Sequence, residues 1–171
     1  MNLLKVTKAL TLAAMLTAVG IVLSFFKIPI TPIIEIRFGS LPIAVAGMSL
    51  GPIVAAIIGA VIDVLGFFVK PTGPFFPGFT ISGIVSGLIF GLVLYKKKLH
   101  PVRILVALVL QTLVVGIIMN TFWLDFMYIK AGFFTTLMMR LPKELVMLPI
   151  NYVLLSVFLY SLQRVTKYAE V

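Results

Sequence analysis

Six stretches of apolar residues run through the chain, separated by short segments rich in proline, glycine or basic residues. They cover residues 7–26, 40–50, 53–68, 79–95, 103–122 and 142–163. A helix needs roughly 20 apolar residues to cross the hydrocarbon of a bilayer, and the stretch 40–50 reaches that length only if its flanks contribute. Prolines and glycines mark nearly every boundary, as expected where a helix must stop. The pattern predicts an all-α membrane protein with six transmembrane helices, in which residues 1–171 form a single domain.

The composition excludes a water-soluble domain. Hydrophobic residues make up 61% of the 171 residues and charged residues 11%, whereas an ordinary globular chain is about half apolar and must still wet its surface. The net charge of +9 does not indicate nucleic-acid binding, because the basic residues stand in short clusters between the apolar stretches. The chain has no cysteine and one histidine, so we expect no disulfide, no metal site and no metal cofactor.

The distribution of lysine and arginine predicts the orientation in the membrane. If the N-terminus lies inside, the inner segments carry Lys5, Lys8, Lys96, Lys97, Lys98, Arg103, Arg164 and Lys167, and the outer segments carry Lys27, Arg37, Lys70, Lys130, Arg140 and Lys143. The dense cluster at residues 96–98 decides the orientation, because short basic loops resist translocation. We therefore expect a multi-pass protein of the cell membrane with both termini in the cytoplasm.

The outer segments carry more cations than carboxylates, which predicts a site for an anionic ligand. Arginine is well shaped to hold a carboxylate through two parallel hydrogen bonds, so Arg37 and Arg140 are candidate ligand contacts, together with Lys70 and Lys143. Two alternatives stay open for the arginines, namely snorkelling to lipid headgroups and pairing with the nearby glutamates.

The segment 70–80 combines a stiff backbone with aromatic surface, since it reads KPTGPFFPGFT. Prolines fix the backbone, glycines allow close approach, and phenylalanine faces can stack on a flat ring. Thr72, Phe75 and Phe76 are therefore candidate ligand contacts. An aromatic belt at the membrane interface is the alternative interpretation.

The segment 119–125, MNTFWLD, places polar groups beside the only tryptophan. The amide of Asn120 both donates and accepts, which suits the edge of a heterocycle, and Trp123 offers a further ring. Hydrogen bonding between helices explains Asn120 equally well, and a place in the interfacial belt explains Trp123.

Asp63 interrupts an otherwise apolar stretch. A lone carboxylate in hydrocarbon is costly, so it must face the bundle, find a partner or stay protonated. A structural bond to a neighbouring helix and a contact with a ligand both satisfy this requirement.

Small residues recur along the first apolar stretch. Ala9, Ala13 and Thr17 stand four residues apart, and so do Ala14 and Ala18. Such a stripe lets another helix approach closely, so it predicts either packing within this bundle or docking on a partner helix.

Motifs of catalysis are missing from the sequence. It contains no nucleotide-binding glycine loop with lysine, no paired-histidine metal motif and no nucleophile elbow. The chain therefore cannot hydrolyse ATP by itself, and powered transport would require a partner.

Several segments together resemble a known family. Residues 76–83, FPGFTISG, preceded by PTGP at 71–74, are similar to the signature of the folate-specific substrate-binding S components of energy-coupling factor (ECF) transporters. RFGSLP at 37–42, the Gly51-Pro52 pair that leads to Asp63, and RLPKE at 140–144 fit the same family. The resemblance covers nearly the whole chain, and the alanine stripe is similar to the motif by which S components dock on their transmembrane partner.

This resemblance implies a six-helix S component that is not an enzyme, binds folate or a related anionic vitamin from outside, and needs no cofactor. Its implied partners are a transmembrane coupling subunit and two ATPase subunits, and it is thought to topple in the membrane to release its cargo. Ala9, Ala13, Ala14 and Ala18 would form the docking surface. The outer loops would form the pocket and its lid.

Two rival interpretations stay open. One is an S component for another vitamin, such as pantothenate or a thiamine precursor. The other is a membrane enzyme acting on lipid-linked anions, which would need a catalytic acid or nucleophile, and only Asp63, Glu35 and Glu144 are available for that role.

Overall fold

The computed structural model describes residues 3–26, 28–29, 35–36, 38–71 and 74–169. The elements are α1 (Leu3–Phe25), β1 (Ile28–Pro29), β2 (Glu35–Ile36), α2 (Ser40–Leu50), α3 (Pro52–Val69), α4 (Pro77–Leu94), α5 (Pro101–Gln111), η1 (Thr112–Met119), α6 (Asn120–Leu124), η2 (Asp125–Ile129) and α7 (Phe133–Ala169). β1 and β2 form a two-residue antiparallel pair. Within the described ranges, this pair is the one departure from the all-helical expectation.

Five helical segments are long and apolar enough to cross a membrane. They are Thr7–Phe25, Pro52–Val69, Pro77–Leu94, Pro101–Met127 and Phe133–Leu162. The sixth apolar helix, α2, has 11 residues, so it spans about 16 Å at 1.5 Å per residue and cannot cross a hydrocarbon core of ~30 Å alone. Residues 42–47 of α2 are buried, which places it inside the bundle.

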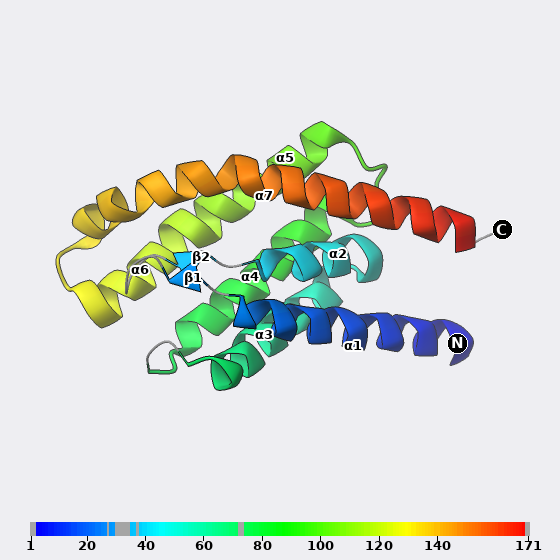
Figure 1. Ribbon diagram of the computed structural model, residues 1–171, viewed down its shortest axis with the longest axis horizontal. Coiled ribbons are helices and arrows are strands. Elements are labelled where there is room, and N and C mark those ends of the chain that lie inside the picture. Colours follow the sequence, from blue (N-terminus) through cyan, green and yellow to red (C-terminus); the bar gives the residue numbers. More distant parts are fainter. Residues whose placement is uncertain (1–2, 27, 30–34, 37, 72–73, 170–171) are drawn as a thin grey trace.

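Close helix packing builds the centre of the molecule. α3 and α4 approach each other through glycines, and a Cβ on Gly83 would lie only 2.7 Å from the carbonyl oxygen of Gly59. Such small-residue contacts are typical of membrane helices. Figure 1 shows both chain ends on one side of the molecule, with the β1–β2 pair, α6 and the beginning of α7 toward the other side.

The helical segment that begins at Pro101 is longer than the apolar pattern predicts. It was expected to end near residue 122, but it continues to Ile129 through two π-helical stretches, η1 and η2, on either side of α6. π-helical turns are rare and occur frequently at functional sites. Asn120 and Trp123 therefore lie on a helix that is bounded by π-helical turns at both ends.

The prediction that the last helix begins near Pro142 is wrong, because α7 begins at Phe133 and contains both Pro142 and Pro149. Asp125 fixes the earlier start. One of its oxygens, Oδ1, accepts hydrogen bonds from the backbone N–H of Gly132 and from Thr136 Oγ1, both at 3.0 Å. Membrane helices tolerate internal prolines because neighbouring groups satisfy the freed carbonyls, so proline is a weak boundary signal here.

Candidate functional site

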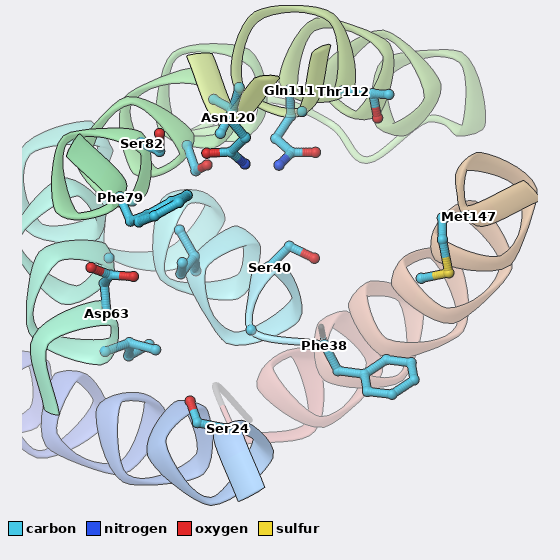
Figure 2. Close-up of a pocket in the computed structure, with 18 of the residues that line it drawn as sticks. Ser24, Phe38, Ser40, Asp63, Phe79, Ser82, Gln111, Thr112, Asn120 and Met147 are labelled. Atoms are coloured by element: carbon cyan, nitrogen blue, oxygen red, sulfur yellow. The ribbon is translucent and has the colours of Figure 1, made fainter. Parts of the chain in front are cut away.

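A cavity of about 260 Å³ lies within the helical bundle. Its wall is formed by the end of α1, the start of α2, the second half of α3, the start of α4, the region from Gln111 to Leu124, and α7 from Arg140 to Asn151. These parts of the helices lie in the half of the molecule away from the two termini. Figure 2 shows side chains converging on this space, among them Asp63 and Phe79 on one side and Met147 on the other.

Aromatic rings cover one part of the cavity wall. Phe75 and Phe76, both expected as ligand contacts, line it together with Phe67 and Phe79. The centroids of Phe67 and Phe75 lie 5.2 Å apart, and those of Phe76 and Phe79 lie 6.1 Å apart, each pair edge to face. Such pairs hold rings in defined orientations, so the wall offers apolar faces on which a flat ligand can stack.

Trp123 supports this wall from behind. Its ring centroid lies 5.3 Å from that of Phe76, but Trp123 is not among the residues that line the cavity. Gly78 makes room for the indole, since a Cβ there would lie 2.7 Å from Trp123 Cδ2. Trp123 is the single tryptophan of the chain. Its fluorescence should therefore respond to changes at Phe76 even if Trp123 itself does not contact a ligand.

Three buried oxygen atoms on the cavity wall have no hydrogen-bond partner among the described residues. They are Ser82 Oγ, Asn120 Oδ1 and Asn151 Oδ1. Buried polar atoms in proteins are nearly always hydrogen-bonded, and an unsatisfied one costs about 1–3 kcal/mol. Figure 2 shows Asn120 and Gln111 directed from the same helical segment toward the space, and Ser82 at its edge. These groups are arranged to bind a polar molecule that enters the cavity.

Asp63 makes the structural bond that the sequence left open as one of two alternatives, and it also lines the cavity. Its Oδ2 accepts a hydrogen bond of 2.9 Å from Thr80 Oγ1, which joins α3 to α4. The same residue lines the cavity, where a carboxylate would accept hydrogen bonds from N–H groups of a ligand.

Arg140 does not snorkel to the membrane surface, because its side chain is only 5% exposed. Its Nη1 donates to Thr121 Oγ1 at 3.1 Å, and its Nη2 donates to Glu144 Oε1 at 3.3 Å. Lys143 Nζ donates to the same glutamate oxygen at 3.2 Å. Arg140, Lys143 and Glu144 all line the cavity, so pairing with a glutamate and access to a ligand occur together.

Cations and carboxylates are equal in number among the described residues of the cavity wall, although the sequence predicted a surplus of cations there. Arg140 and Lys143 stand against Asp63 and Glu144. The cations come from α7, whereas Asp63 comes from α3, so the wall has a cationic region and a separate acceptor region. Arg37, a further predicted cation, lies outside the described residues, and so does Thr72.

Lys70 lies away from the cavity wall in this structure. Its Nζ donates to the carbonyl oxygen of Phe25 at 3.1 Å, at the C-terminal end of α1. A cation there is favourable because the last carbonyl groups of a helix carry partial negative charge. The segment 70–80 thus divides, with Lys70 holding two helices together and Phe75 and Phe76 facing the cavity.

The sequence interpretation missed several polar wall residues. They are Ser24, Ser40, Ser82, Ser86, Gln111, Thr112, Glu144 and Asn151. The sequence contains a pattern that could have identified some of these residues. Ser82 and Ser86 are four residues apart and so share one helix face, and Gln111 and Asn151 each interrupt an apolar stretch as Asp63 does. Polar groups inside membrane helices generally face the bundle interior.

The predicted docking alanines do not share one environment. Ala13 packs against the core of the bundle, whereas Ala9, Ala14 and Ala18 are exposed. Ala14 and Ala18 belong to the outer face of α1, near the exposed Leu10 and Val22. That outer face, defined by Ala14 and Ala18, is available to another helix.

Metal binding finds no support in the described part of the chain. No group of three or more His, Cys, Asp and Glu side chains there is placed to hold a metal ion. The described residues of the cavity wall offer ring faces, hydrogen-bonding groups and paired charges.

Comparisons with known proteins show the family to which the chain is similar. The sequence profile of the family described as "ECF transporter, substrate-specific component" matches residues 8–159. The folate transporter FolT of Clostridium novyi is 41% identical over 153 residues, which are 88% of this chain and 87% of that protein. The folate transporter FolT of Leuconostoc mesenteroides is 33% identical over 165 residues, covering 94% of this chain and 88% of that protein.

The fold also matches a solved structure. A crystal structure of FolT bound with folic acid superposes with a TM-score of 0.80 at 35% sequence identity, covering 88% of this chain and 91% of that one. The S-component fold expected from the sequence is therefore confirmed.

The hydrogen bond between Thr121 and Arg140 can be tested by mutation. The hydroxyl of Thr121 accepts this bond from the guanidinium, and Thr121 is fully buried. We expect Thr121→Val to lower the free energy of unfolding by about 1–3 kcal/mol, since a buried charged donor loses its acceptor. Thr121→Ser keeps the oxygen and is the matched control, with a much smaller loss. Thermal unfolding in detergent measures both, and equal stability of the valine and serine variants would refute this role.

Proposed function

Because the chain belongs to the substrate-specific components of ECF transporters, we propose that it binds folate in the cavity and that partner subunits supply the energy for uptake. The family consists of transporter components, so the interpretation as a membrane enzyme is wrong. The apolar helices make the chain a multi-pass membrane protein.

Three kinds of group surround one cavity, and this combination is the main support for folate binding. Phe75 and Phe76 offer ring faces. The side-chain oxygens of Asn120 and Ser82 have no hydrogen-bond partner among the described residues. Arg140 and Lys143 supply positive charge. Folate has the matching parts, namely a flat pterin, hydrogen-bonding ring edges and the two carboxylates of its glutamate. The resemblance to two folate transporters and to a folic-acid-bound structure supports the same ligand.

The positions of the groups suggest how folate lies in the cavity. The pterin stacks among the phenylalanines, where Asp63 accepts hydrogen bonds from its N–H groups and Asn120 meets its amide-like edge. The glutamate carboxylates then reach Arg140 and Lys143 on α7, where charge-assisted hydrogen bonds are strong. A flavin or another uncharged ring would form no charge-assisted hydrogen bond with these cations through a carboxylate.

The side of the membrane on which the cavity opens follows from its place in the bundle and from the proposed orientation of the chain. Its wall lies in the half of the bundle away from both termini. With cytoplasmic termini, as the basic cluster 96–98 favours, the cavity faces the outside of the cell. Capture from outside and delivery to the cytoplasm then require the protein to move in the cell membrane.

Energy for that movement has to come from other polypeptides, because the sequence contains no nucleotide-binding motif. The proposed partners are the coupling subunit and two ATPase subunits of an ECF transporter. The outer face of α1 at Ala14 and Ala18 is the proposed docking surface, since exposed small residues allow a partner helix to approach closely.

Folate binding is tested on the purified protein by quenching of Trp123 fluorescence or by calorimetry. We expect saturable binding of folic acid, and Arg140→Ala should weaken it by about 1.5–3 kcal/mol, as for loss of a charged hydrogen bond. Arg103→Ala is the matched control, because Arg103 lies outside the cavity and donates to the carbonyl of Lys98.

Pantothenate, thiamine and riboflavin serve as competitors in the same assay. Absence of a saturable signal with micromolar folic acid, or displacement of folic acid by one of these vitamins at lower concentration, would contradict the assignment. Equal affinity of the wild type and Arg140→Ala would remove Arg140 from the site.

Docking is tested by adding bulk to the outer face of α1. Ala14→Leu or Ala18→Leu should abolish ATP-driven uptake in cells and leave folic acid binding by the purified protein nearly unchanged, because these residues do not line the cavity. Ile57→Phe adds bulk at an exposed position of α3 and should permit uptake. If binding fell together with uptake, the alanines would be part of the internal packing.

A further inference from the structure

Glu144 occupies an unusual position between two cations of the cavity wall. Arg140 Nη2 and Lys143 Nζ both donate to the same oxygen, Oε1, at 3.3 and 3.2 Å. The three side chains are 5%, 19% and 13% exposed for Arg140, Lys143 and Glu144. At this burial the charges interact strongly, because little water is present to screen them.

The fold holds the carboxylate of Glu144 in this position. Its other oxygen, Oε2, faces Gly116 in η1, where a Cβ would lie 3.0 Å away. Behind Glu144 is a second cavity of about 110 Å³, lined almost entirely by aliphatic side chains such as Leu113, Ile117 and Leu145. A carboxylate gains nothing by turning into such a space, so Glu144 stays beside the cations when a ligand arrives.

Ordinary helix stabilisation does not account for this arrangement. Arg140 and Glu144 stand four residues apart on α7, a spacing that on an exposed helix contributes only a few tenths of a kcal/mol. Here Lys143 joins the same oxygen, and all three residues face the cavity. Glu144 therefore pairs with Arg140 and Lys143, the same two cations that the proposed function assigns to the carboxylates of folate.

We infer that Glu144 is a specificity-determining residue that stands in for the ligand's carboxylate in the empty cavity and competes with it during binding. This inference rests on the proposed function. The charge of Glu144 keeps Arg140 and Lys143 compensated when no ligand is present. The same charge repels an incoming anion, so it limits the affinity for folate and favours its release.

The inference predicts opposite effects on stability and on binding when the charge is removed. In Glu144→Gln the ligand-free protein should melt at a lower temperature, because the buried Arg140 and the partly buried Lys143 lose a counter-charge. Folic acid should bind about tenfold tighter, a change within the usual range of coupling between groups of one hydrogen-bond and salt-bridge network. Folic acid with both glutamate carboxyls converted to carboxamides should bind the variant and the wild type equally.

Asp125→Asn is the matched control for neutralising a carboxylate. Asp125 stabilises the start of α7 and does not line the cavity, so this variant should lose stability without gaining affinity for folic acid. Glu144→Asp provides a second variant that keeps the charge but shortens the side chain. Its carboxylate is drawn back from the cations, and its affinity for folic acid should lie between those of the wild type and Glu144→Gln.

The outcomes separate this inference from the proposed function. Wild-type protein that does not bind folic acid would refute the proposed function and this inference with it. Wild-type binding, with folic acid bound equally or more weakly by Glu144→Gln, would refute the inference alone and make Glu144 a structural residue. Equal gains for folic acid and its carboxamide would also overturn it, because the effect would then not depend on the ligand's charge. Where Glu144→Gln does not fold, an affinity of Glu144→Asp equal to or below the wild type overturns it.

Discussion

The structure depends on how two cations are accommodated inside a bundle of apolar helices. Charged groups in hydrocarbon are costly unless they are paired and hydrogen-bonded. Arg140 is held between Thr121 on α6 and Glu144 one turn along α7, and Lys143 shares the glutamate. These bonds turn the polar side of α7 toward the interior and tie it to the π-helical region around Gly116. The cavity wall can carry charge because these hydrogen bonds and ion pairs satisfy the two cations there. The opposite side of α7 can then be apolar.

The same division between interior and exterior relates binding to transport. Large apolar side chains such as Leu10, Ile53 and Phe134 are exposed on the outside of the bundle, where a bilayer would cover them. Polar groups such as Ser82, Asn120 and Asn151 collect around the cavity. The outer face of α1 carries the small exposed side chains of Ala14 and Ala18, which permit a close helix contact. The proposed binding cavity and the proposed docking surface therefore lie on separate surfaces of one small bundle.

The sequence predicted those features whose physical cause is local. Apolar stretches of sufficient length predicted the helices, and the cost of charge in hydrocarbon predicted that Asp63 faces the bundle or finds a partner. For Arg140 the sequence left snorkelling and pairing with a glutamate open, and the structure shows the pairing. The start of α7 was misplaced because proline is common at the first position of a helix, which made Pro142 look like the beginning. The true start depends on Asp125, which contacts Gly132 and Thr136 only after the chain folds. The π-helical turns have no sequence signature of their own. Ser82 was overlooked because serine in membrane helices often bonds only its own backbone, and the direction of Lys70 depends on where the end of α1 lies.

A structure of the purified protein determined with saturating folic acid tests the central claim most directly. The account predicts folic acid in the cavity, with its pterin among Phe75, Phe76 and Phe79 and a glutamate carboxylate within hydrogen-bonding distance of Arg140 or Lys143. Folic acid bound elsewhere, or bound with its glutamate directed away from both cations, would contradict it.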